Sequence, residues 1–250
     1  MNTNKLTGKV ALVTGGSRGL GTAIANALAD EGADIAITYI ASAEKAGLVV
    51  RALEAKGVRA AAFKSDQGDP TQAAPLIQAV VSRFGRLDIL VNNAAVAYQG
   101  KTIDDPNIDN DMMDRQWAVN VHGVIANIRA AAKVLPEGGR IITISSGVAV
   151  RAGFAGTADY AGTKAAVTGY SKGAARDLAP RKITVNVVAA GLMNTDMAAE
   201  ADVAEMLFST LAIQRFAALE EVAAGVVFLA SPAASYVTGA VLNVEGGYSA

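Results

Sequence analysis

The segment from residue 10 to residue 21 constrains the fold of this chain more than any other. It reads Val-Ala-Leu-Val-Thr-Gly-Gly-Ser-Arg-Gly-Leu-Gly, so an apolar run, a glycine-rich turn and a helical pattern follow one another directly. The first turn of a helix offers unpaired N–H groups and the positive end of the helix dipole, and glycines let an anion approach that backbone closely. The segment therefore predicts a buried strand and a phosphate-binding turn; the alternative is a tight turn without a ligand.

Short runs rich in Val and Ile alternate with longer Ala-rich segments of helical periodicity, which is typical of βαβ units that build a parallel sheet. We expect strands at residues 10–14, 34–38, 59–64, 89–91, 140–145, 184–188 and 241–244. We expect helices near residues 19–31, 43–56, 71–84, 111–134, 158–178 and 220–229. The pattern predicts a Rossmann-type, doubly wound α/β fold, in which helices cover both faces of a mostly parallel seven-stranded sheet, as a single domain over residues 1–250.

The segment 192–216 departs from this alternation because it follows the sixth strand without a strand of its own. Met193, Met197 and Met206 lie in it and could line an adaptable apolar pocket. We expect a mobile flap over the site, with a plain helical excursion on the surface as the alternative.

The composition excludes several classes of function. The chain has no cysteine and only one histidine, His122, so a disulfide framework, a thiol nucleophile and a metal site are not expected. The 22 basic and 23 acidic residues nearly balance, which gives no electrostatic footprint for nucleic acid or an anionic membrane. The beginning of the chain lacks the apolar core of a signal peptide. We expect a cytoplasmic protein that acts on small molecules.

A tyrosine and a lysine one helical turn apart are the first candidates for chemistry. Tyr160 and Lys164 have i, i+4 spacing in a helical segment, so their side chains are neighbours, and a nearby ammonium is expected to lower the phenol pKa towards neutrality. An accidental surface pair is the alternative. Upstream, Ser145 and Ser146 end a predicted strand at the sheet edge where open α/β sheets bind ligands, and one of these hydroxyls could hold a carbonyl oxygen.

Together these motifs resemble the short-chain dehydrogenase/reductase family along essentially the whole chain. The glycine-rich turn resembles the cofactor turn of that family, and the segment Asn-Asn-Ala-Ala at 92–95 resembles its Asn-Asn-Ala-Gly element. Asn120 and Ser146 match its catalytic Asn and Ser, and Tyr160 with Lys164 matches its Tyr-x-x-x-Lys pair. The segment 186–197 resembles the part that closes on the nicotinamide.

The resemblance implies a role for each group. Ser146 would bind the substrate oxygen, Tyr160 would donate its proton, Lys164 would activate Tyr160 and bind ribose, and Asn120 would hold a water in a proton relay. The cofactor site would comprise Tyr160 and Lys164 together with residues around the turn and the sheet edge. These are Gly15, Ser17, Arg18, Gly19, Leu20, Gly21, Tyr39, Ser42, Asp66, Gln67, Asn93, Ala94, Ala95, Gly191, Met193 and Thr195. Asp66 would meet the adenine. We expect the substrate pocket to be lined by Ser146, Val96, Tyr98, Val148, Phe154 and Met193.

The chain departs from the family pattern at three places. Ala190 replaces the usual proline before Gly191, Ala95 replaces a glycine, and Ser146 lies one residue farther from Tyr160 than is commonest. None of these changes removes a reactive group. The extra residue predicts a bulge in the loop between residues 147 and 159.

These observations favour an NADP(H)-dependent oxidoreductase that interconverts a small ketone or aldehyde and an alcohol. We expect NADPH to be preferred over NADH because Tyr39 stands where an NAD site places an acid, and Arg18 can reach a ribose phosphate. A second candidate, suggested by the same family, is 3-oxoacyl-carrier-protein reductase. The resemblance implies basic residues where the acidic carrier docks, which Arg181 fits and Glu137 does not. A third is a non-catalytic nucleotide-binding sensor. The family resemblance also implies a homotetramer built through the helices at 111–134 and 158–178 and the last strand.

Overall fold

One sheet organises the protein, whose computed structural model describes residues 4–193 and 207–250. Its strands are β1 (Val10–Val13), β2 (Asp34–Tyr39), β3 (Ala60–Lys64), β4 (Ile89–Asn92), β5 (Arg140–Ser146), β6 (Thr184–Ala190) and β7 (Val241–Val244). They lie in the order β3-β2-β1-β4-β5-β6-β7, and every neighbouring pair is parallel. The predicted doubly wound α/β fold is confirmed, with a sheet that is parallel throughout.

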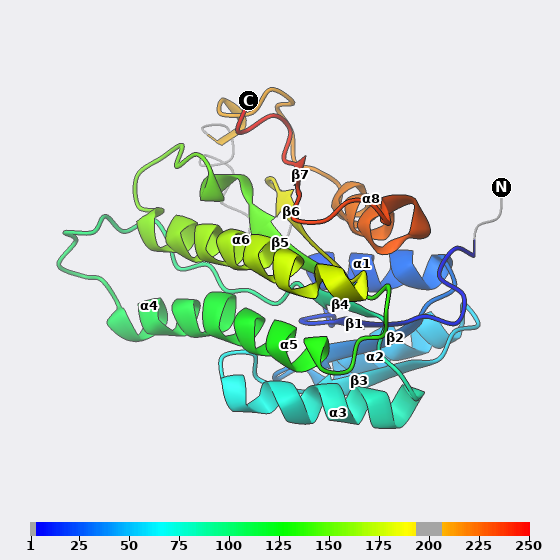
Figure 1. Cartoon of the computed structure of the whole chain (residues 1–250). Coiled ribbons are helices and arrows are strands. Elements are labelled where there is room, and N and C mark those ends of the chain that lie inside the picture. Colours follow the sequence, from blue (N-terminus) through cyan, green and yellow to red (C-terminus); the bar gives the residue numbers. More distant parts are fainter. Residues whose placement is uncertain (1–3, 194–206) are drawn as a thin grey trace.

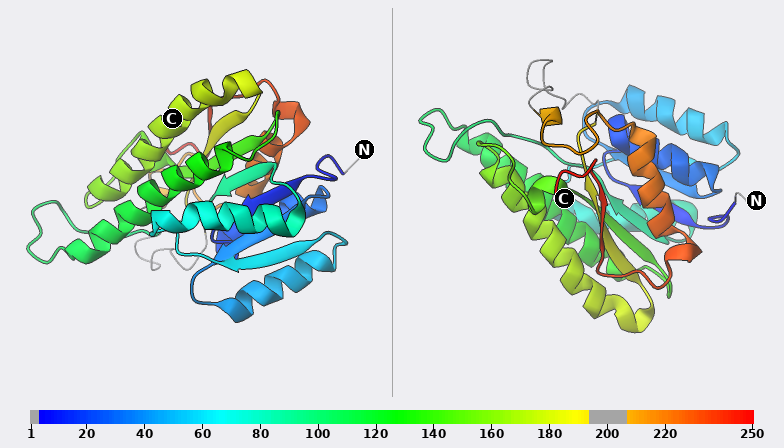
Figure 2. Two further views of the ribbon diagram at one scale, coloured as in Figure 1. Left: turned by 60° about the horizontal axis from the view of Figure 1, so that its bottom comes forward. Right: turned by 90° about the horizontal axis from the view of Figure 1, so that it is seen from above.

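Helices cover both faces of this sheet (Figures 1 and 2). One layer holds α1 (Gly19–Asp30), α2 (Ala43–Glu54) and α8 (Leu219–Ala230). The other holds α3 (Ala73–Phe84), α5 (Gly123–Ala132) and α6 (Ala158–Leu178), and α4 (Asn110–Trp117) leads into α5. Short 3-10 turns precede α3 (Pro70–Gln72) and follow β5 (Gly147–Ala149), α6 (Ala179–Arg181) and α8 (Pro232–Ala234). Within the described ranges, no helix is long and apolar enough to cross a membrane.

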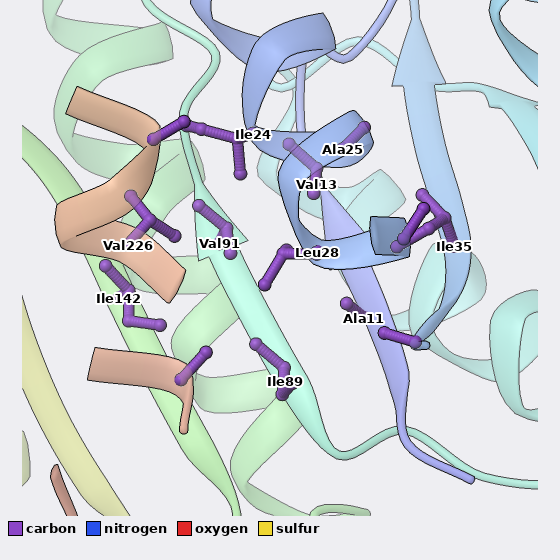
Figure 3. Close-up of a cluster of buried hydrophobic side chains, with 14 of the residues drawn as sticks. Ala11, Val13, Ile24, Ala25, Leu28, Ile35, Ile89, Val91, Ile142 and Val226 are labelled. Carbon is purple, nitrogen blue, oxygen red and sulfur yellow. The ribbon is translucent and has the colours of Figure 1, made fainter. Parts of the chain in front are cut away.

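The inner strands β1, β4 and β6 are largely apolar because both of their faces are buried. In β1, Ala11 and Val13 point into the cluster beneath α1 and α8, whereas Val10 and Leu12 point into the cluster beneath α3 and α5. Figure 3 shows the first cluster, in which Leu28 of α1 and Val226 of α8 converge on the central strands. This packing fixes the strand register and therefore where each strand ends.

The chain order reverses between β1 and β4, which are adjacent in the sheet. The connections from these two strands run to opposite faces, so a crevice opens beyond their carboxyl ends, where open α/β sheets bind ligands. The glycine-rich turn follows β1 there, and the Asn-Asn motif ends β4 there. The fold thus brings together the two motifs that lie 78 residues apart at Gly15 and Asn93.

The predicted continuous helix at 111–134 is interrupted. Between α4 and α5 the chain forms a π-helical turn over Ala118–His122, in which the Gly123 N–H donates to the Ala118 carbonyl. Such turns insert one extra residue into a helix and occur at functional sites. Here the turn carries Asn120, which is buried, and His122, which is exposed. The apolar pattern runs on through the turn, so it gave no sign of this break.

Candidate active site

The glycine-rich turn after β1 is shaped by backbone conformations that favour glycine. Gly15 and Gly19 have positive φ angles of 65° and 51°. A β-carbon at Gly21 would collide with the Gly15 carbonyl oxygen and the Asn93 side chain, so α1 can start directly beneath the turn only with glycine there. The first-turn N–H groups of α1 therefore lie at the crevice with little side-chain bulk around them, and the turn fits a dinucleotide pyrophosphate.

Three polar side chains lock this turn to its neighbours. The Gly15 N–H donates to Thr38 Oγ1 at 2.9 Å. The N–H groups of Asn93 and Ala94 both donate to Thr14 Oγ1 at 3.0 Å, and Asn93 Nδ2 donates to the Thr14 carbonyl at 2.8 Å. The Asn93 amide, predicted to border the cofactor, is therefore committed to holding β1 and β4 together at their ends.

Gln67 and Asp66, which follow β3, are likewise engaged by the protein. Gln67 is buried, and its Nε2 donates to the carbonyls of Ala94 at 2.7 Å and Val119 at 3.0 Å. Asp66, predicted to meet the adenine, accepts two hydrogen bonds from Arg115 at 2.6 and 3.0 Å. The Arg115 guanidinium keeps the pKa of Asp66 below its usual value, so this carboxylate is charged. Arg115 was not among the predicted site residues, because no local motif links it to Asp66, which lies 49 positions away in the sequence.

The structure separates the two serines at the end of β5. Ser145 is buried, and its hydroxyl bonds to the Lys164 carbonyl at 3.1 Å and to Thr168 Oγ1 at 3.0 Å, both in α6. Ser146 points to the other side because side chains alternate along a strand. It begins the Gly147–Ala149 turn, and its Oγ accepts weakly from the Val148 N–H at 3.4 Å. Ser145 is therefore a packing residue, whereas the Ser146 hydroxyl has only this weak contact within the protein.

Lys164 places the tyrosine helix against the same strand end. It is buried, and its Nζ donates to the Ile144 carbonyl of β5 at 3.1 Å. The same Nζ lies 5.6 Å from the centre of the Tyr160 ring. α6 also packs on β5 and on the turn after Ser146, so Ser146, Tyr160 and Lys164 come from adjoining elements at one edge of the sheet.

The ionisation of this pair differs from the expectation. Burial raises the pKa of Tyr160 to about 12 and lowers the pKa of Lys164 to about 8. The prediction that Lys164 brings the phenol pKa towards neutrality is therefore wrong for the protein alone, because loss of water contact disfavours phenolate and ammonium alike. At neutral pH Tyr160 is a phenol and Lys164 is mostly charged. A protonated phenol is the form that can donate a proton.

Asn120 reaches the site through its π-helical turn. Its side chain accepts from the Val96 N–H at 2.9 Å and donates to the Val96 carbonyl at 2.8 Å. Its Nδ2 also lies 3.3 Å from Thr163 Oγ1, which donates to the Tyr160 carbonyl at 2.8 Å. The Asn120 side chain thus ties the loop after β4 to the tyrosine helix.

The residues predicted to line the substrate pocket lie on three segments. Val96 and Tyr98 follow β4, where the Tyr98 N–H donates to Gln116 Oε1 at 2.6 Å and its hydroxyl accepts from the Asp109 N–H at 2.9 Å. Val148 and Phe154 lie on the loop after Ser146. Met193 pairs with Ala217 in an isolated parallel bridge and packs on the core.

The remaining predicted cofactor residues lie around the turn and the sheet edge. Ser17 and Arg18 line a cleft of about 580 Å³ beside α1, which Lys45 of α2 also lines. Leu20 is a buried residue of α1, Tyr39 ends β2, and Ser42 precedes α2. Ala95 continues the Asn-Asn motif. Thr195, Met197 and Met206, with most of the predicted flap, lie outside the described residues.

Gly191 is confined by the last strand. A β-carbon at Gly191 would lie 2.6 Å from Glu245 Cα. The Gly191 N–H donates to the Val244 carbonyl at 3.0 Å. Glu245 and Tyr248 were not predicted as site residues, although an acid, two glycines and a tyrosine directly after the last strand are a visible signal. Within residues 4–193 and 207–250, no cluster of His, Asp or Glu side chains suits a metal ion.

The parallel sheet, the glycine-rich turn at its crevice and the adjoining Ser, Tyr and Lys define a dinucleotide-binding oxidoreductase of Rossmann type. Residues 15–249 match the family model described as enoyl-(acyl carrier protein) reductase. The chain belongs to the short-chain dehydrogenase/reductase family.

Relatives span the whole chain. An uncharacterised oxidoreductase of Methylorubrum extorquens is 43% identical and covers 98% of this chain and 99% of its own length. A 3-oxoacyl-[acyl-carrier-protein] reductase of Staphylococcus aureus is 40% identical, covering 96% of this chain and 97% of its own. A cyclic-di-GMP-binding biofilm dispersal mediator protein of Escherichia coli is 39% identical, covering 98% of each.

Solved structures agree with this assignment. A blue fluorescent protein from a metagenomic library, in complex with NADPH, has a TM-score of 0.94 and 43% identity over 98% of this chain and 100% of its own. A short-chain dehydrogenase from Burkholderia cenocepacia, in complex with NADP, has a TM-score of 0.93 and 46% identity over 99% of this chain and 100% of its own. The chain is therefore an NAD(P)-binding oxidoreductase.

Proposed function

We propose that this protein is a carbonyl reductase that uses NADPH to reduce a small, free ketone or aldehyde to an alcohol. The observation that carries the proposal is the packing of Lys164 against the carboxyl end of β5, which sets Ser146, Tyr160 and Lys164 at one edge of the crevice. Every group that the reaction needs from the protein is present there in a usable ionisation state.

Each side chain has one task in this reaction. Ser146 donates a hydrogen bond to the substrate oxygen and orients the carbonyl carbon. Tyr160, held as a phenol by burial, gives its proton to that oxygen as the bond order falls. The Lys164 ammonium stabilises the phenolate that remains. The glycine-rich turn after β1 would hold NADPH, which would supply the hydride. Asn120, carried on the π turn, holds the water through which Tyr160 regains a proton.

The preference for NADPH is supported by the end of β2. Tyr39 ends this strand, and its partner in the register is Lys64 of β3. An acid at this point would repel a ribose phosphate, but here the sequence offers an aromatic ring beside a cation. Arg18 and Lys45 line the cleft next to the turn, and a guanidinium can bind phosphate oxygens with two hydrogen bonds.

Reduction of a 3-oxoacyl group on carrier protein is the second candidate, because a relative at 40% identity bears that name. The surface expected to dock an acidic carrier does not favour it. Arg181 donates to the carbonyl oxygens of Ala132 and Leu135 at the end of α5. Glu137 is exposed and pairs with Lys182 at 2.7 Å. The cations at this place are thus engaged with the protein, and an acid stands among them.

A sensor that binds a nucleotide without turnover is the candidate from a different class, since the Escherichia coli relative is named for binding cyclic-di-GMP. The complete set of Ser146, Tyr160, Lys164 and Asn120 favours an enzyme, because a sensor has no need of a proton donor.

One experiment separates the three candidates. Oxidation of NADPH is followed with a panel of free ketones and aldehydes, with a 3-oxoacyl thioester on carrier protein, and with no acceptor. Turnover of free ketones that Tyr160→Phe abolishes supports the proposal. Turnover of the carrier-bound substrate alone favours the second candidate, and nucleotide binding without any turnover favours the sensor.

We also propose a homotetramer. On α6, added β-carbons at Gly169 and Gly173 would meet nothing within 4 Å, so this helix has a flat face that another helix could approach closely. Light scattering at micromolar concentration tests this, and a stable monomer would defeat it.

A further inference from the structure

The segment after β7 folds back over the loop that follows Ser146. Tyr248 in this segment is buried, with 6% of its surface exposed. A β-carbon at Gly147, the first residue of the loop, would lie 2.7 Å from Tyr248 Cδ1. At the other end of the ring, the hydroxyl accepts a hydrogen bond from the Gly153 N–H at 2.7 Å. The tyrosine ring thus spans the loop between residues 147 and 153.

The loop is built to receive this ring. A β-carbon at Gly153 would lie 2.5 Å from the Tyr248 hydroxyl, so both ends of the contact need glycine. Between them, Arg151 Nη1 donates to the Tyr248 carbonyl at 2.6 Å, and its guanidinium lies 5.4 Å from the ring centre. The loop therefore grips Tyr248 through its hydroxyl, its ring face and its main chain.

Tyr248 is itself held from the strand side. Glu245 is buried, and its Oε1 accepts from the Ser249 N–H at 3.1 Å and from the Ser249 hydroxyl. Its other carboxylate oxygen packs against Gly147. These contacts close the segment into a compact turn that follows β7, so Tyr248 connects the loop to the end of the sheet.

We propose that Tyr248 is a positioning residue for substrate binding, a role that rests on the proposed carbonyl reductase activity. The loop carries Val148 and Phe154, and Ser146 precedes it. Farther along, the Gly156 carbonyl accepts from the Gly100 N–H at 2.8 Å, which joins the loop to the segment that carries Tyr98. By fixing Gly153, the Tyr248 hydroxyl would set the distance between these segments, and thereby the size of the carbonyl compound that the proposed substrate pocket accepts.

The test uses Tyr248→Phe, which keeps the ring and removes only the acceptor for the Gly153 N–H. Tyr236→Phe is the matched control, because Tyr236 is 99% exposed. We expect Tyr248→Phe to raise KM for the best small ketone by about three- to tenfold, the range for one lost hydrogen bond, with kcat and NADPH affinity nearly unchanged. The ratio of kcat/KM between bulky and small ketones should rise, and the control should alter none of these values.

A second variant distinguishes positioning from general destabilisation. Gly153→Ala sets a methyl group against the Tyr248 hydroxyl and should change KM in the full-length enzyme. In combination with Tyr248→Phe, the same change should have a smaller effect because the colliding oxygen is gone. Additive effects, or an unchanged bulky-to-small ratio in Tyr248→Phe, would overturn the proposal, even if thermal stability fell.

Amide hydrogen exchange gives a readout that does not depend on turnover. In Tyr248→Phe we expect faster exchange in the peptide covering residues 147–157 and no change in the peptides of β1 and α1. If the unmodified protein reduces no carbonyl compound, the proposed function fails, and faster exchange would still support the hold on Gly153. Unchanged exchange in this loop would overturn the proposal whatever the activity.

Discussion

The hydroxyl of Ser145 donates to the main-chain oxygen of Lys164 at 3.1 Å, although the next residue, Ser146, faces the crevice. We therefore expect opposite consequences from two matched substitutions. Ser146→Ala should lose most carbonyl reduction at unchanged thermal stability. Ser145→Ala should keep activity but lose about 1 kcal/mol of unfolding free energy, since a buried hydrogen bond is removed. Kinetics and chemical denaturation of both variants check this, and loss of activity in Ser145→Ala alone would reverse the assignment.

Tyr160→Phe removes one oxygen from the site. We expect nearly all turnover to disappear while NADPH binding, measured by fluorescence titration, stays close to that of the unmodified protein, because only the transferable proton is lost. Tyr170→Phe, another hydroxyl deletion in α6, is the control and should stay active. Substantial turnover in Tyr160→Phe would reject this residue as the proton donor.

The rate of reduction should depend on the charge of Lys164. Its pKa is lowered to about 8, whereas that of Tyr160 is raised to about 12. The phenol therefore keeps its proton through the neutral and mildly basic range, and Lys164 loses its own first. We expect kcat/KM for ketone reduction to be level below pH 8 and to fall above it, with one limb. A profile that stays level to pH 10 would show that the ammonium is dispensable.

Lys164 should also make folding stability depend on pH. Between its lowered pKa of about 8 and the ordinary value of 10.5, the unfolded chain holds a proton that the folded chain has released. The free energy of unfolding of the unmodified protein, compared with that of a variant with a neutral residue at position 164, therefore rises with pH between these two values. We expect Lys164→Met to unfold at higher temperature than the unmodified protein below pH 8, by on the order of 1–3 kcal/mol in unfolding free energy. The difference in unfolding free energy between the two proteins should shrink towards pH 10.5. A difference that stays constant with pH would contradict the burial of a charged amine.

The cofactor preference is tested at the glycine-rich turn. Arg18→Ala should weaken NADPH binding far more than NADH binding, because the guanidinium is proposed to bind the ribose phosphate. Lys5→Ala, remote from the turn, should affect neither. Steady-state kinetics measure the ratio of kcat/KM with NADPH to kcat/KM with NADH. An equal or higher kcat/KM of the unmodified protein with NADH would contradict the proposed preference.

Sequence periodicity predicted the sheet well because strands buried on both faces must be apolar over their length. It could not show which way a motif side chain points. Asn93 and Gln67 lie just after the predicted ends of their strands, but their side-chain amides bind main-chain carbonyls of neighbouring segments. The pKa of Tyr160 differs from the expectation for a related reason: spacing shows that Lys164 is near, but only the packed structure shows how far the buried Lys164 and the partly buried Tyr160 lose contact with water.

Sequence patterns could not predict contacts between segments that lie far apart in the chain. Arg115 reaches Asp66, and Tyr248 reaches Gly153 from 95 positions away. Neither pair has a local pattern, because each depends on how two loops leave their strands.

The π-helical turn at Ala118–His122 sets the rotational phase between α4 and α5. Each residue of a regular helix advances the chain by about 100°, so deleting one residue there would restore ordinary helical bonding and swing all of α4 around its axis by that angle. Arg115 would turn away from Asp66 and Gln116 from Tyr98, although the helix would then have regular α-helical hydrogen bonds along its whole length. One surplus residue thus acts as a spacer whose loss would leave a well-formed helix with the wrong side chains facing the crevice.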